Sequence, residues 1–357
     1  MTSIRRREFP GLLLGAAAAW SQDIRTVAAP VSAYSGWPTV TRRRNGDLLL
    51  VWSGDREAHV CPFGRVLLSA SRDEGETWTA PRVILDTDLD DRDAGIVETE
   101  QGTLLVSTFT SLAYEQSKSP PAHWAGARER LSPELRKQML GCWLLRSTDE
   151  GVTWSAPYRV PVNSPHGPAA VSGGRLLYAG KDLWGNGDVG VCESRDDGVT
   201  WKWLAKFTPR PGDDVKNYHE LHLVEAGPGR VIAQIRNHNE ANRNETLQCE
   251  SNDGGKTWSV PHAIGVWGLP SHLLRLSDGR LVMSYGYRRQ PFGNMARFSS
   301  DRGATWSEPV TVSADGSGGD LGYPSTVQLN GGDLLTIWYE RLAGSRNAVL
   351  RQRRWRG

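Results

Sequence analysis

The sequence of 357 residues lacks two features that would define broad functional classes. No apolar run approaches the roughly 20 residues that a membrane-spanning helix needs. Charge of one sign is also missing, because 42 basic residues are balanced by 40 acidic ones to a net charge of +2. That balance argues against a protein that binds nucleic acid by neutralising phosphates. We therefore expect neither a membrane span nor a nucleic-acid partner.

Cysteine is scarce, and the four residues show no C-x-x-C spacing, so a zinc ribbon or a redox pair is not indicated. We expect buried free thiols rather than disulfides. His219 and His222 hint at a metal, but alternation along a strand sends the two side chains to opposite faces. No metal and no other cofactor is expected. The cysteines are Cys61, Cys142, Cys192 and Cys249.

The first 20 residues have the layout of an export signal, in which arginines precede a short apolar stretch from Gly11 to Ala19. The run Arg6-Arg7-Glu8-Phe9 resembles the twin-arginine type, which exports folded proteins. We expect cleavage near Ala19 to Gln22 and an exported protein. The remaining residues, 21–357, are expected to form a single domain.

What the chain does have is 15 Trp, 39 Gly and 20 Pro, the composition of a turn-rich all-β protein. The pattern Ser-x-Asp-x-Gly-x-Thr-Trp recurs at the spacing of propeller blades. Its Asp can accept backbone N–H bonds in a tight turn, and its Gly permits a positive φ. We interpret these boxes as structural turns. They occupy Ser71–Trp78, Ser147–Trp154, Ser194–Trp201, Ser251–Trp258 and Ser299–Trp306.

A second repeat consists of a turn followed by an apolar strand, and it occurs six times, which indicates six hairpins. Six units of four antiparallel strands predict an all-β fold, a six-bladed β-propeller. The last unit lacks a fourth strand, and residues around Ile24 to Ala29 are expected to supply it and so close the ring. The turns lie at Asn45-Gly46, Gln101-Gly102, Gly173-Gly174, Pro228-Gly229, Asp278-Gly279 and Gly331-Gly332.

In each unit the turn and the box fall on one face, so the opposite face carries the open ends of the hairpins. The long connection Ser111 to Leu140, with an expected helix from Ser132 to Met139, lies on that face as a wall or lid. Counting from the turns places Glu220 opposite Arg236 and Tyr323 opposite Glu340. Ring closure is expected to bring these four together with His272 and Arg288, as a candidate site.

The boxes resemble the Asp-box, or BNR, repeat of the sialidase (neuraminidase) superfamily of exo-glycosidases, whose fold is a six-bladed propeller. The resemblance covers nearly the whole chain after the export signal. That family uses a Tyr nucleophile activated by a Glu. Tyr323, in Gly-Tyr-Pro-Ser, matches the Tyr, and Glu220, in Tyr-His-Glu-Leu, matches the Glu. Arg236 matches one of three arginines that hold the substrate carboxylate, and Arg288 or Arg289 matches another. Glu340 matches the carboxylate that steadies the first arginine.

That first arginine is missing, because Gly36-Trp37-Pro38 stands where the family has Arg-Ile-Pro. Arg56 could replace the lost cation from the facing strand. The family's acid is an Asp, and none fits well in the matching segment; Glu57, His59 or Asp93 could serve instead. Other residues expected around the substrate are Arg92, His166, His272 and Tyr287.

Three functions fit these observations. The first is an exported exo-glycoside hydrolase that cleaves a terminal sialic acid or another anionic sugar with retention, with a glycan as its partner. The second is a non-catalytic carbohydrate-binding propeller, favoured by the missing arginine. The third is a polysaccharide lyase or another glycosidase that uses His and Tyr, for which His59, His166 and His272 are the candidates.

Overall fold

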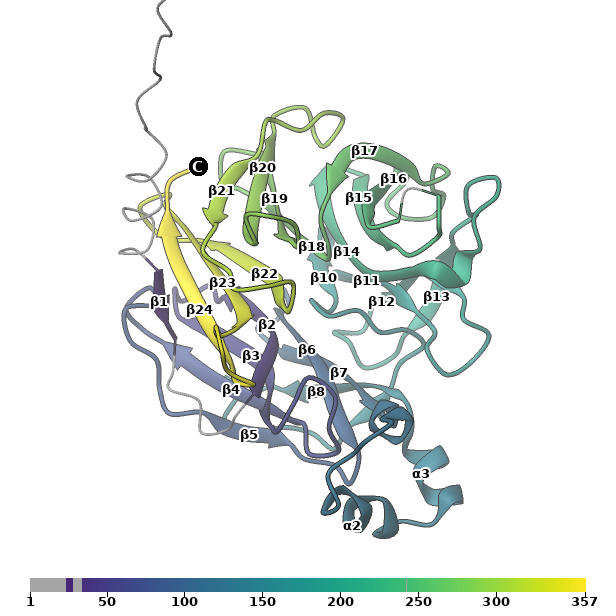
Figure 1. The fold of residues 1–357 in the computed structure, drawn as a ribbon. Helices are drawn as coiled ribbons and strands as arrows, with labels where there is room; N and C mark the ends of the chain where they lie inside the picture. The colour runs from purple at the N-terminus through teal and green to yellow at the C-terminus, as the bar shows by residue number, and fades with distance from the viewer. Residues whose placement is uncertain (1–23, 28–33, 242) are drawn as a thin grey trace, which may run out of the picture.

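The computed structural model describes residues 24–27, 34–241 and 243–357, and its ribbon is a ring of small twisted β-sheets, called blades below (Figure 1). Each blade has four antiparallel strands, and the first strand of each lies nearest the axis of the ring. The expected six-bladed propeller is confirmed. The expected export signal, residues 1–20, lies outside the described residues.

The strands follow one another in the same order in every blade. Blade 1 holds β2 (Tyr34–Arg42), β3 (Leu48–Arg56), β4 (Arg65–Ser71) and β5 (Arg82–Leu85), and blade 2 holds β6 (Asp90–Glu98), β7 (Leu104–Ser111), β8 (Cys142–Ser147) and β9 (Tyr158–Arg159). Blade 3 holds β10 (Ala169–Val171), β11 (Arg175–Lys181), β12 (Val189–Ser194) and β13 (Lys202–Lys206), and blade 4 holds β14 (Tyr218–Gly227), β15 (Arg230–Asn237), β16 (Glu245–Ser251) and β17 (His262–Trp267). Blade 5 holds β18 (Ser271–Arg275), β19 (Leu281–Tyr287), β20 (Gly293–Ser299) and β21 (Val310–Ser313), and blade 6 holds β22 (Leu321–Gln328), β23 (Leu334–Arg341), β24 (Ala348–Trp355) and β1 (Ile24–Thr26).

The ring is closed by chain segments far apart in sequence. Strand β1 pairs antiparallel with β24, with Ile24 opposite Arg353, which confirms that this segment supplies the missing fourth strand of blade 6. A parallel bridge from Tyr34 to Ala348 then links blade 6 to blade 1. Closure in this way covers the outer edge of β24, which would otherwise expose unpaired backbone groups.

The boxes are turns between the third and fourth strands, as expected. In the first box, Asp73 accepts hydrogen bonds from the Thr77 backbone N–H at 2.9 Å and the Thr77 hydroxyl at 2.5 Å, while Ser71 Oγ accepts from Gly75 N at 2.8 Å. Hydrogen bonds to the ionised carboxylate lower the pKa of Asp73 to about 2. The same hydrogen bonds recur in the other four boxes, so each Asp has its oxygens occupied by its own turn.

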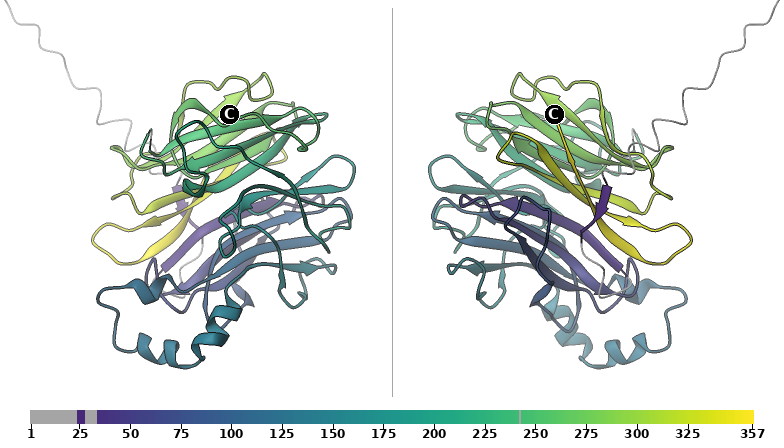
Figure 2. Two further views of the ribbon diagram at one scale, coloured as in Figure 1. Left: turned by 90° about the vertical axis from the view of Figure 1, so that its right-hand side faces the viewer. Right: turned by 90° about the vertical axis from the view of Figure 1, so that its left-hand side faces the viewer.

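The long connection between β7 and β8 forms three short helices. They are η1 (Ala113–Gln116), α2 (Trp124–Glu129) and α3 (Pro133–Met139). Ser132 caps α3, because its side chain accepts from Leu135 N at 3.3 Å. The expected helix is therefore confirmed, and the helices project from the body of the propeller (Figure 2). This connection is called the insertion below.

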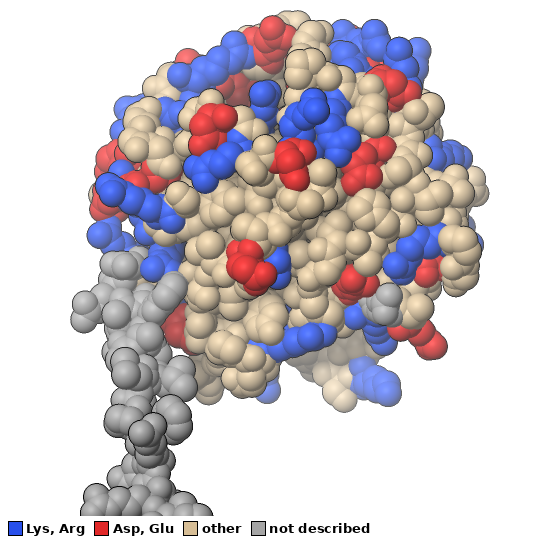
Figure 3. All heavy atoms as spheres, turned by 90° about the horizontal axis from the view of Figure 1, so that it is seen from above, with Lys and Arg blue, Asp and Glu red and all other residues tan. Residues whose placement is uncertain are grey.

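The interior is built from apolar clusters between neighbouring blades. All four cysteines are free and buried, and Cys61 lies in a separate small cluster with Tyr114 and Trp124 of the insertion. No helix in the described ranges is long and apolar enough to cross a membrane. On the face shown in Figure 3, acidic and basic side chains lie interspersed, in keeping with the small net charge of +2.

Candidate active site

The innermost strands of the blades, here called the inner strands, all begin at the face opposite the boxes. Their first residues surround one end of the channel that runs along the axis, and this end is called the mouth. Antiparallel pairing puts the ends of the second strands, such as Arg236 on β15, at the same end. Chain segments hundreds of residues apart therefore contribute side chains to one place.

Four inner strands carry the same irregularity near the mouth. Each has a β-bulge that leaves two residues unpaired, and the first of the two is a non-glycine residue with positive φ. Such backbone costs about 1–3 kcal/mol at each position and persists only where the surroundings enforce it, most often at functional sites. A bulge also re-aims a side chain. The four residues are Trp37 (φ 55°), Asp93 (47°), Glu220 (44°) and Tyr323 (52°).

Tyr323, Glu220 and Arg236 form a hydrogen-bonded group at the mouth, as the sequence predicts. The Tyr323 hydroxyl donates to Glu220 Oε1 at 2.5 Å. Arg236 Nη1 donates to the same hydroxyl at 3.1 Å and also forms an ion pair with Glu220 Oε2. Tyr323 and Glu220 come from blades 6 and 4, so the group spans the channel.

The charges at the mouth hold this group in a defined protonation state. Burial would raise the pKa of Glu220, but Arg236 and the hydrogen bonds outweigh burial and lower it, so the carboxylate is ionised. Burial and then the Glu220 charge raise the pKa of Tyr323 well above its usual value. The phenol is therefore protonated, and its proton points at a carboxylate that can accept it.

Arg288 extends the cationic side of the group. Its guanidinium carbon lies 5.8 Å from the centroid of the Tyr323 ring, and its Nε donates to the backbone oxygen of Leu321 at 2.9 Å. Arg288 also lowers the pKa of Glu220 through its charge, after the larger effects of Arg236 and Tyr323. Two guanidinium groups, those of Arg236 and Arg288, thus face the mouth from blades 4 and 5.

Asp93 is the one candidate acid that burial prepares for proton transfer. It sits on the bulge of β6 and is 7% exposed. Burial raises its pKa to about 7; the Arg92 charge opposes this rise and the Glu220 charge adds to it. Its charge in turn raises the pKa of Tyr323. Within the described residues no hydrogen bond to the Asp93 carboxyl is found. A carboxyl that titrates near neutral pH is suited to general acid catalysis.

Trp37 occupies the place that corresponds to the missing family arginine. Its ring is 1% exposed and lies against Tyr323, with 6.4 Å between centroids. The guanidinium carbons of Arg92 and Arg56 lie 4.4 Å and 4.8 Å from the Trp37 centroid, and His59 contacts the ring edge-on at 5.1 Å. Cations over an indole face are stabilised by its quadrupole.

Arg56 does not replace the lost cation at the surface of the mouth, because its side chain is fully buried. It forms two parallel hydrogen bonds with Asp90, at 2.5 Å and 3.0 Å, and donates to Ser53 Oγ at 2.9 Å. Arg92 is better placed, with 11% of its side chain exposed and a longer contact of 3.6 Å to Asp90. Of the two, Arg92 is the cation that a ligand can reach.

Glu340 does not face the mouth, which corrects the expectation that it pairs with Tyr323. Its carboxylate pairs with Arg351 at 2.8 Å, and Leu321 lies opposite it in the sheet. The bulge at Tyr323 takes up two residues and shifts the pairing. As a result Tyr339 lies against the Tyr323 ring, with 5.8 Å between centroids. The same kind of bulge places His219, rather than Glu220, opposite Arg236.

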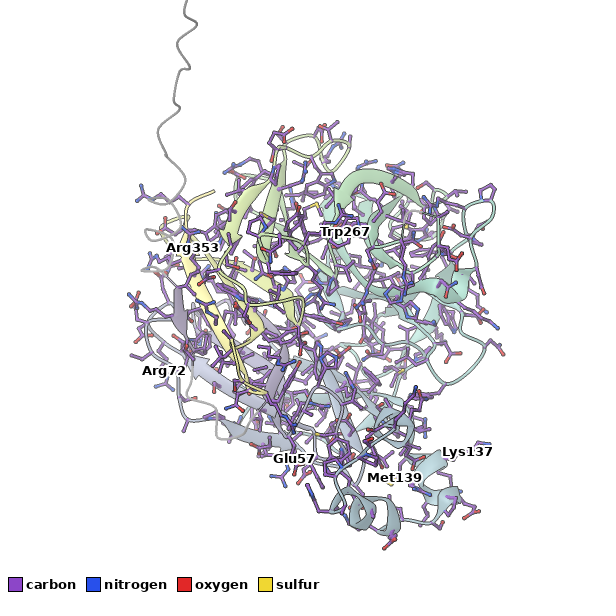
Figure 4. All side chains as sticks on the ribbon, in the orientation of Figure 1. Glu57, Arg72, Lys137, Met139, Trp267 and Arg353 are labelled. Atoms are coloured by element: carbon purple, nitrogen blue, oxygen red, sulfur yellow. The ribbon has the colours of Figure 1, made fainter. Side chains whose placement is uncertain are left out.

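Glu57 is held by the insertion. Its carboxylate accepts from Trp124 Nε1 at 2.7 Å and contacts His123 Nε2 at 2.8 Å, and Figure 4 shows it beside the helices and apart from Trp267. Glu57 thus fixes the insertion against blade 1. His59 instead contacts Tyr34 Oη at 2.7 Å and Asp320 at 3.0 Å, next to Trp37.

The remaining predicted residues do not contact Tyr323. Tyr287, the last residue of β19, lies at the mouth end of blade 5 but packs edge-on against Trp267, with 6.2 Å between centroids. His166 and His272 lie deeper in the channel and contact each other at 4.9 Å between centroids, below the bulges. They are not part of the group around Tyr323.

Sequence reasoning missed an aromatic and acidic cluster beside Trp37. Tyr34 and Tyr339 both donate to Asp320 Oδ1 at 3.0 Å. Burial would raise the pKa of Asp320, but its hydrogen bonds, with His59 first, lower it to about 2. His219 and His238 lie next to Glu220, with 4.7 Å between ring centroids. The sequence offered one signal for the first cluster, the alternation that puts Tyr339 on the face opposite Glu340.

The comparisons with known proteins agree with the propeller fold. The model of the BNR repeat-like domain matches residues 66–336. A sialidase from Bacteroides fragilis is 25% identical over 340 residues, which cover 85% of this chain and 59% of that protein. The chain therefore spans less than two thirds of the length of that curated relative.

Two solved structures share the fold over most of the chain. A protein of unknown function from Dyadobacter fermentans is 25% identical, with a TM-score of 0.72 and coverage of 94% of this chain and 100% of that one. The NanB sialidase from Streptococcus pneumoniae has a TM-score of 0.72 at 14% identity and covers 94% of this chain and 70% of that one.

Proposed function

This chain belongs to the family of BNR repeat-like domains, and from that premise we propose that it is a sialidase-like exo-glycoside hydrolase. The observation that carries the proposal is the 2.5 Å hydrogen bond from the Tyr323 hydroxyl to Glu220. A buried phenol with a carboxylate positioned to take its proton is an activated nucleophile. The similarity to a sialidase over 85% of the chain supports the same chemistry.

In the proposed reaction, Tyr323 Oη attacks the anomeric carbon while Glu220 takes the phenol proton. The bond to the leaving oxygen breaks, and Asp93 donates its proton to that oxygen. Water then attacks the tyrosyl-linked sugar, Asp93 takes a proton from this water, and Glu220 returns the proton to Tyr323. Two displacements at one carbon give retention of configuration.

The substrate is an anionic sugar. Arg236 and Arg288 present guanidinium groups at the mouth, and guanidinium pairs well with carboxylate. Trp37 stands where the family pattern has its first arginine. The guanidinium carbon of Arg92, from the neighbouring blade, lies 4.4 Å from the Trp37 ring centroid and provides a cation instead. A terminal sialic acid, or a sugar whose carboxylate is placed differently, fits this altered set. The Arg-rich start of residues 1–20 favours export of the protein to where such glycans occur.

A panel of terminal glycosides tests the proposal, and it should include α-sialosides, α- and β-uronides and neutral sugars. We expect turnover of an anionic glycoside, with the first product formed in the anomeric configuration of the substrate, as read by proton NMR. Turnover should be lost in Tyr323→Phe. Absence of turnover on the whole panel, with glycan binding intact in Glu220→Gln, would instead establish a carbohydrate-binding propeller.

An unsaturated product that absorbs in the near ultraviolet would establish a lyase. The structure gives that alternative less support, because His166 and His272 contact each other deeper in the channel, away from Tyr323.

A further inference from the structure

A cavity lies on the opposite side of the propeller from Tyr323. It has a volume of about 980 Å³ and is lined by the inner strands of all six blades, from the level of His166 and His272 down to the turns near Arg44 and Asn330. The turns belong to the face that carries the boxes. A cavity of this size is at the upper end of the range for small-molecule sites.

Three histidines form the floor of this cavity. The ring centroids of His166, His222 and His272 lie 4.6–5.4 Å from one another. His222 Nδ1 accepts from Leu273 N at 2.9 Å, and His272 Nδ1 accepts from Thr326 N at 3.4 Å. A neutral imidazole has one N–H, so His222 and His272 carry their protons on Nε2.

The third histidine is incompletely satisfied. His166 Nδ1 contacts Thr39 Oγ1 at 3.2 Å, but its Nε2 is buried and has no hydrogen-bond partner among the described residues. The side chain is 2% exposed. A buried polar atom without a partner costs free energy unless a bound molecule supplies one. In the described part of the chain no group of His, Cys, Asp or Glu is arranged to hold a metal ion.

The outer end of the cavity is basic. Arg42, Arg44 and Arg275 line it, and none of their side chains forms an ion pair with a carboxylate in the described residues. Arg43 is different, because Glu98 contacts it at 3.3 Å. The carboxylate that lines the cavity, Glu225, is already bound by the Ser172 backbone N–H and hydroxyl.

We propose that this cavity is a second ligand site, for an acidic oligosaccharide of a few sugar units that enters from the box face with its uncharged end against the histidines. The site is separate from the mouth, so this proposal does not depend on the proposed hydrolase activity. A carboxylate on the outer sugar would pair with Arg275 and Arg42.

The cavity has an uncharged floor and a basic rim, and this difference favours a ligand with one uncharged and one anionic end. The floor offers N–H groups and one unpaired ring nitrogen but no cation, so an anion placed there would lose its hydration without a counter-charge. Hydroxyl groups can both accept and donate, and thus satisfy all three imidazoles. Between floor and rim the walls include apolar side chains such as Leu273 and Val327, against which the faces of sugar rings can pack.

Binding of glucuronosyl-xylobiose, a trisaccharide whose single carboxylate lies on its terminal sugar, is measured by calorimetry and tests the proposal. We expect Arg275→Ala, which changes an exposed rim residue, to weaken binding about tenfold, the loss that corresponds to about 1.4 kcal/mol. Arg280→Ala is the matched control, because Arg280 lies in the same hairpin turn but pairs with Asp278 at 2.8 Å. Arg288→Ala, which alters the mouth, should remove any binding at the mouth and leave the binding that depends on Arg275 unchanged. Neutral maltotriose should bind much more weakly.

Histidine-selective ¹⁵N NMR supplies the second measurement. Glucuronosyl-xylobiose should shift the Nε2 resonances of His222 and His272, assigned through His→Gln variants. The proposal is overturned if binding is lost in Arg288→Ala but kept in Arg275→Ala, or if the two Nε2 resonances do not move. Equal binding of pentaglutamate and glucuronosyl-xylobiose would show that the site recognises charge alone, and would overturn the assignment to a sugar. Any of these outcomes leaves the hydrolase proposal for the mouth untouched.

Discussion

The Tyr323 hydroxyl donates a hydrogen bond of 2.5 Å to Glu220 across the channel, although the two residues are 103 positions apart in sequence. Each stands on a bulge of an inner strand with a positive φ, 52° for Tyr323 and 44° for Glu220. The contact therefore depends on two strained backbone positions that the closed ring holds in register. Residues placed at such cost are expected to have a function other than packing.

Removal of the phenol oxygen should abolish the reaction without unfolding the protein. Tyr323→Phe keeps the ring that packs against Trp37 and Tyr339. We expect kcat/KM for the best glycoside to fall by at least about a hundredfold, the lower end of what proton-transfer catalysis alone contributes. Tyr158→Phe is the control, since its hydroxyl bonds Gly198 O on the box face. A Tyr323→Phe enzyme as active as Tyr158→Phe would contradict the assignment of the nucleophile.

The pH dependence of activity should report the Asp93 carboxyl. With its pKa near 7, Asp93 can donate a proton at lower pH, so kcat/KM should fall as the pH rises above about 7. In Asp93→Asn this limb should disappear along with most of the activity on substrates with poor leaving groups. Retention of the limb in Asp93→Asn would point to His59, next to Trp37, as the acid.

Folding stability should depend on the same carboxyl. The folded-state pKa of Asp93 is raised from 3.8 to about 7, so between these values the folded protein binds a proton that the unfolded chain does not. The contribution of Asp93 to the free energy of unfolding is therefore highest at low pH. It declines as the pH rises through this window, by up to about 1.4 kcal/mol per pH unit. Asp91, whose pKa burial also raises to about 7, contributes in the same direction.

Urea denaturation between pH 5 and 8 measures this effect. The decline of stability with pH should be shallower in Asp93→Asn than in the wild type. Asp88→Asn, at an exposed position shortly before β6, serves as the control and should follow the wild type. Parallel curves for the wild type and Asp93→Asn would contradict a raised pKa.

Truncation of Trp37 should damage both the fold and the mouth. The ring is 1% exposed and supports Arg92 and Arg56, so Trp37→Ala should lower the free energy of unfolding by about 3–5 kcal/mol. Trp184, which is 45% exposed, is the matched control, and its replacement by Ala should change stability by about 0.5 kcal/mol or less. Thermal denaturation of the two variants checks the difference; similar losses would contradict a supporting role for Trp37.

Glu57 should control the insertion rather than the chemistry. Glu57→Gln weakens the contacts to His123 and Trp124, so residues 112–141 should be cleaved faster by trypsin. We expect KM to rise while kcat changes little, because the wall of the mouth loosens and the group around Tyr323 is unchanged. A large loss of kcat with KM intact would instead identify Glu57 as the general acid.

Much of the architecture could be predicted from the sequence, because its causes are local. The box at Ser71–Trp78 fixes its turn through its own side chains, and each glycine turn marks a hairpin. Even the role of the segment near Ile24 followed from counting strands. Tyr323, Glu220 and Arg236 could be predicted through the family pattern, since all three retain the expected neighbours in sequence.

The details of the mouth could not be predicted, because they arise from ring closure. Each bulge leaves two residues unpaired, and the pairs concerned, such as Trp37-Pro38 and Asp93-Ala94, share no local signal. Counting from the turns therefore misplaced Glu340, and Tyr339 took the position facing Tyr323. The burial that raises the pKa of Asp93 is likewise a property of the assembled blades.

The pairing of β1 with β24 has a consequence for how the molecule is made. The strand Ile24–Thr26 is synthesised long before Arg351 and Arg353, its partners in the sheet. The ring therefore cannot close until the sixth blade has been synthesised. Until then the ring formed by the earlier blades remains open. The mouth, which needs Tyr323 of that blade, is therefore assembled late, after nearly the whole chain has been synthesised.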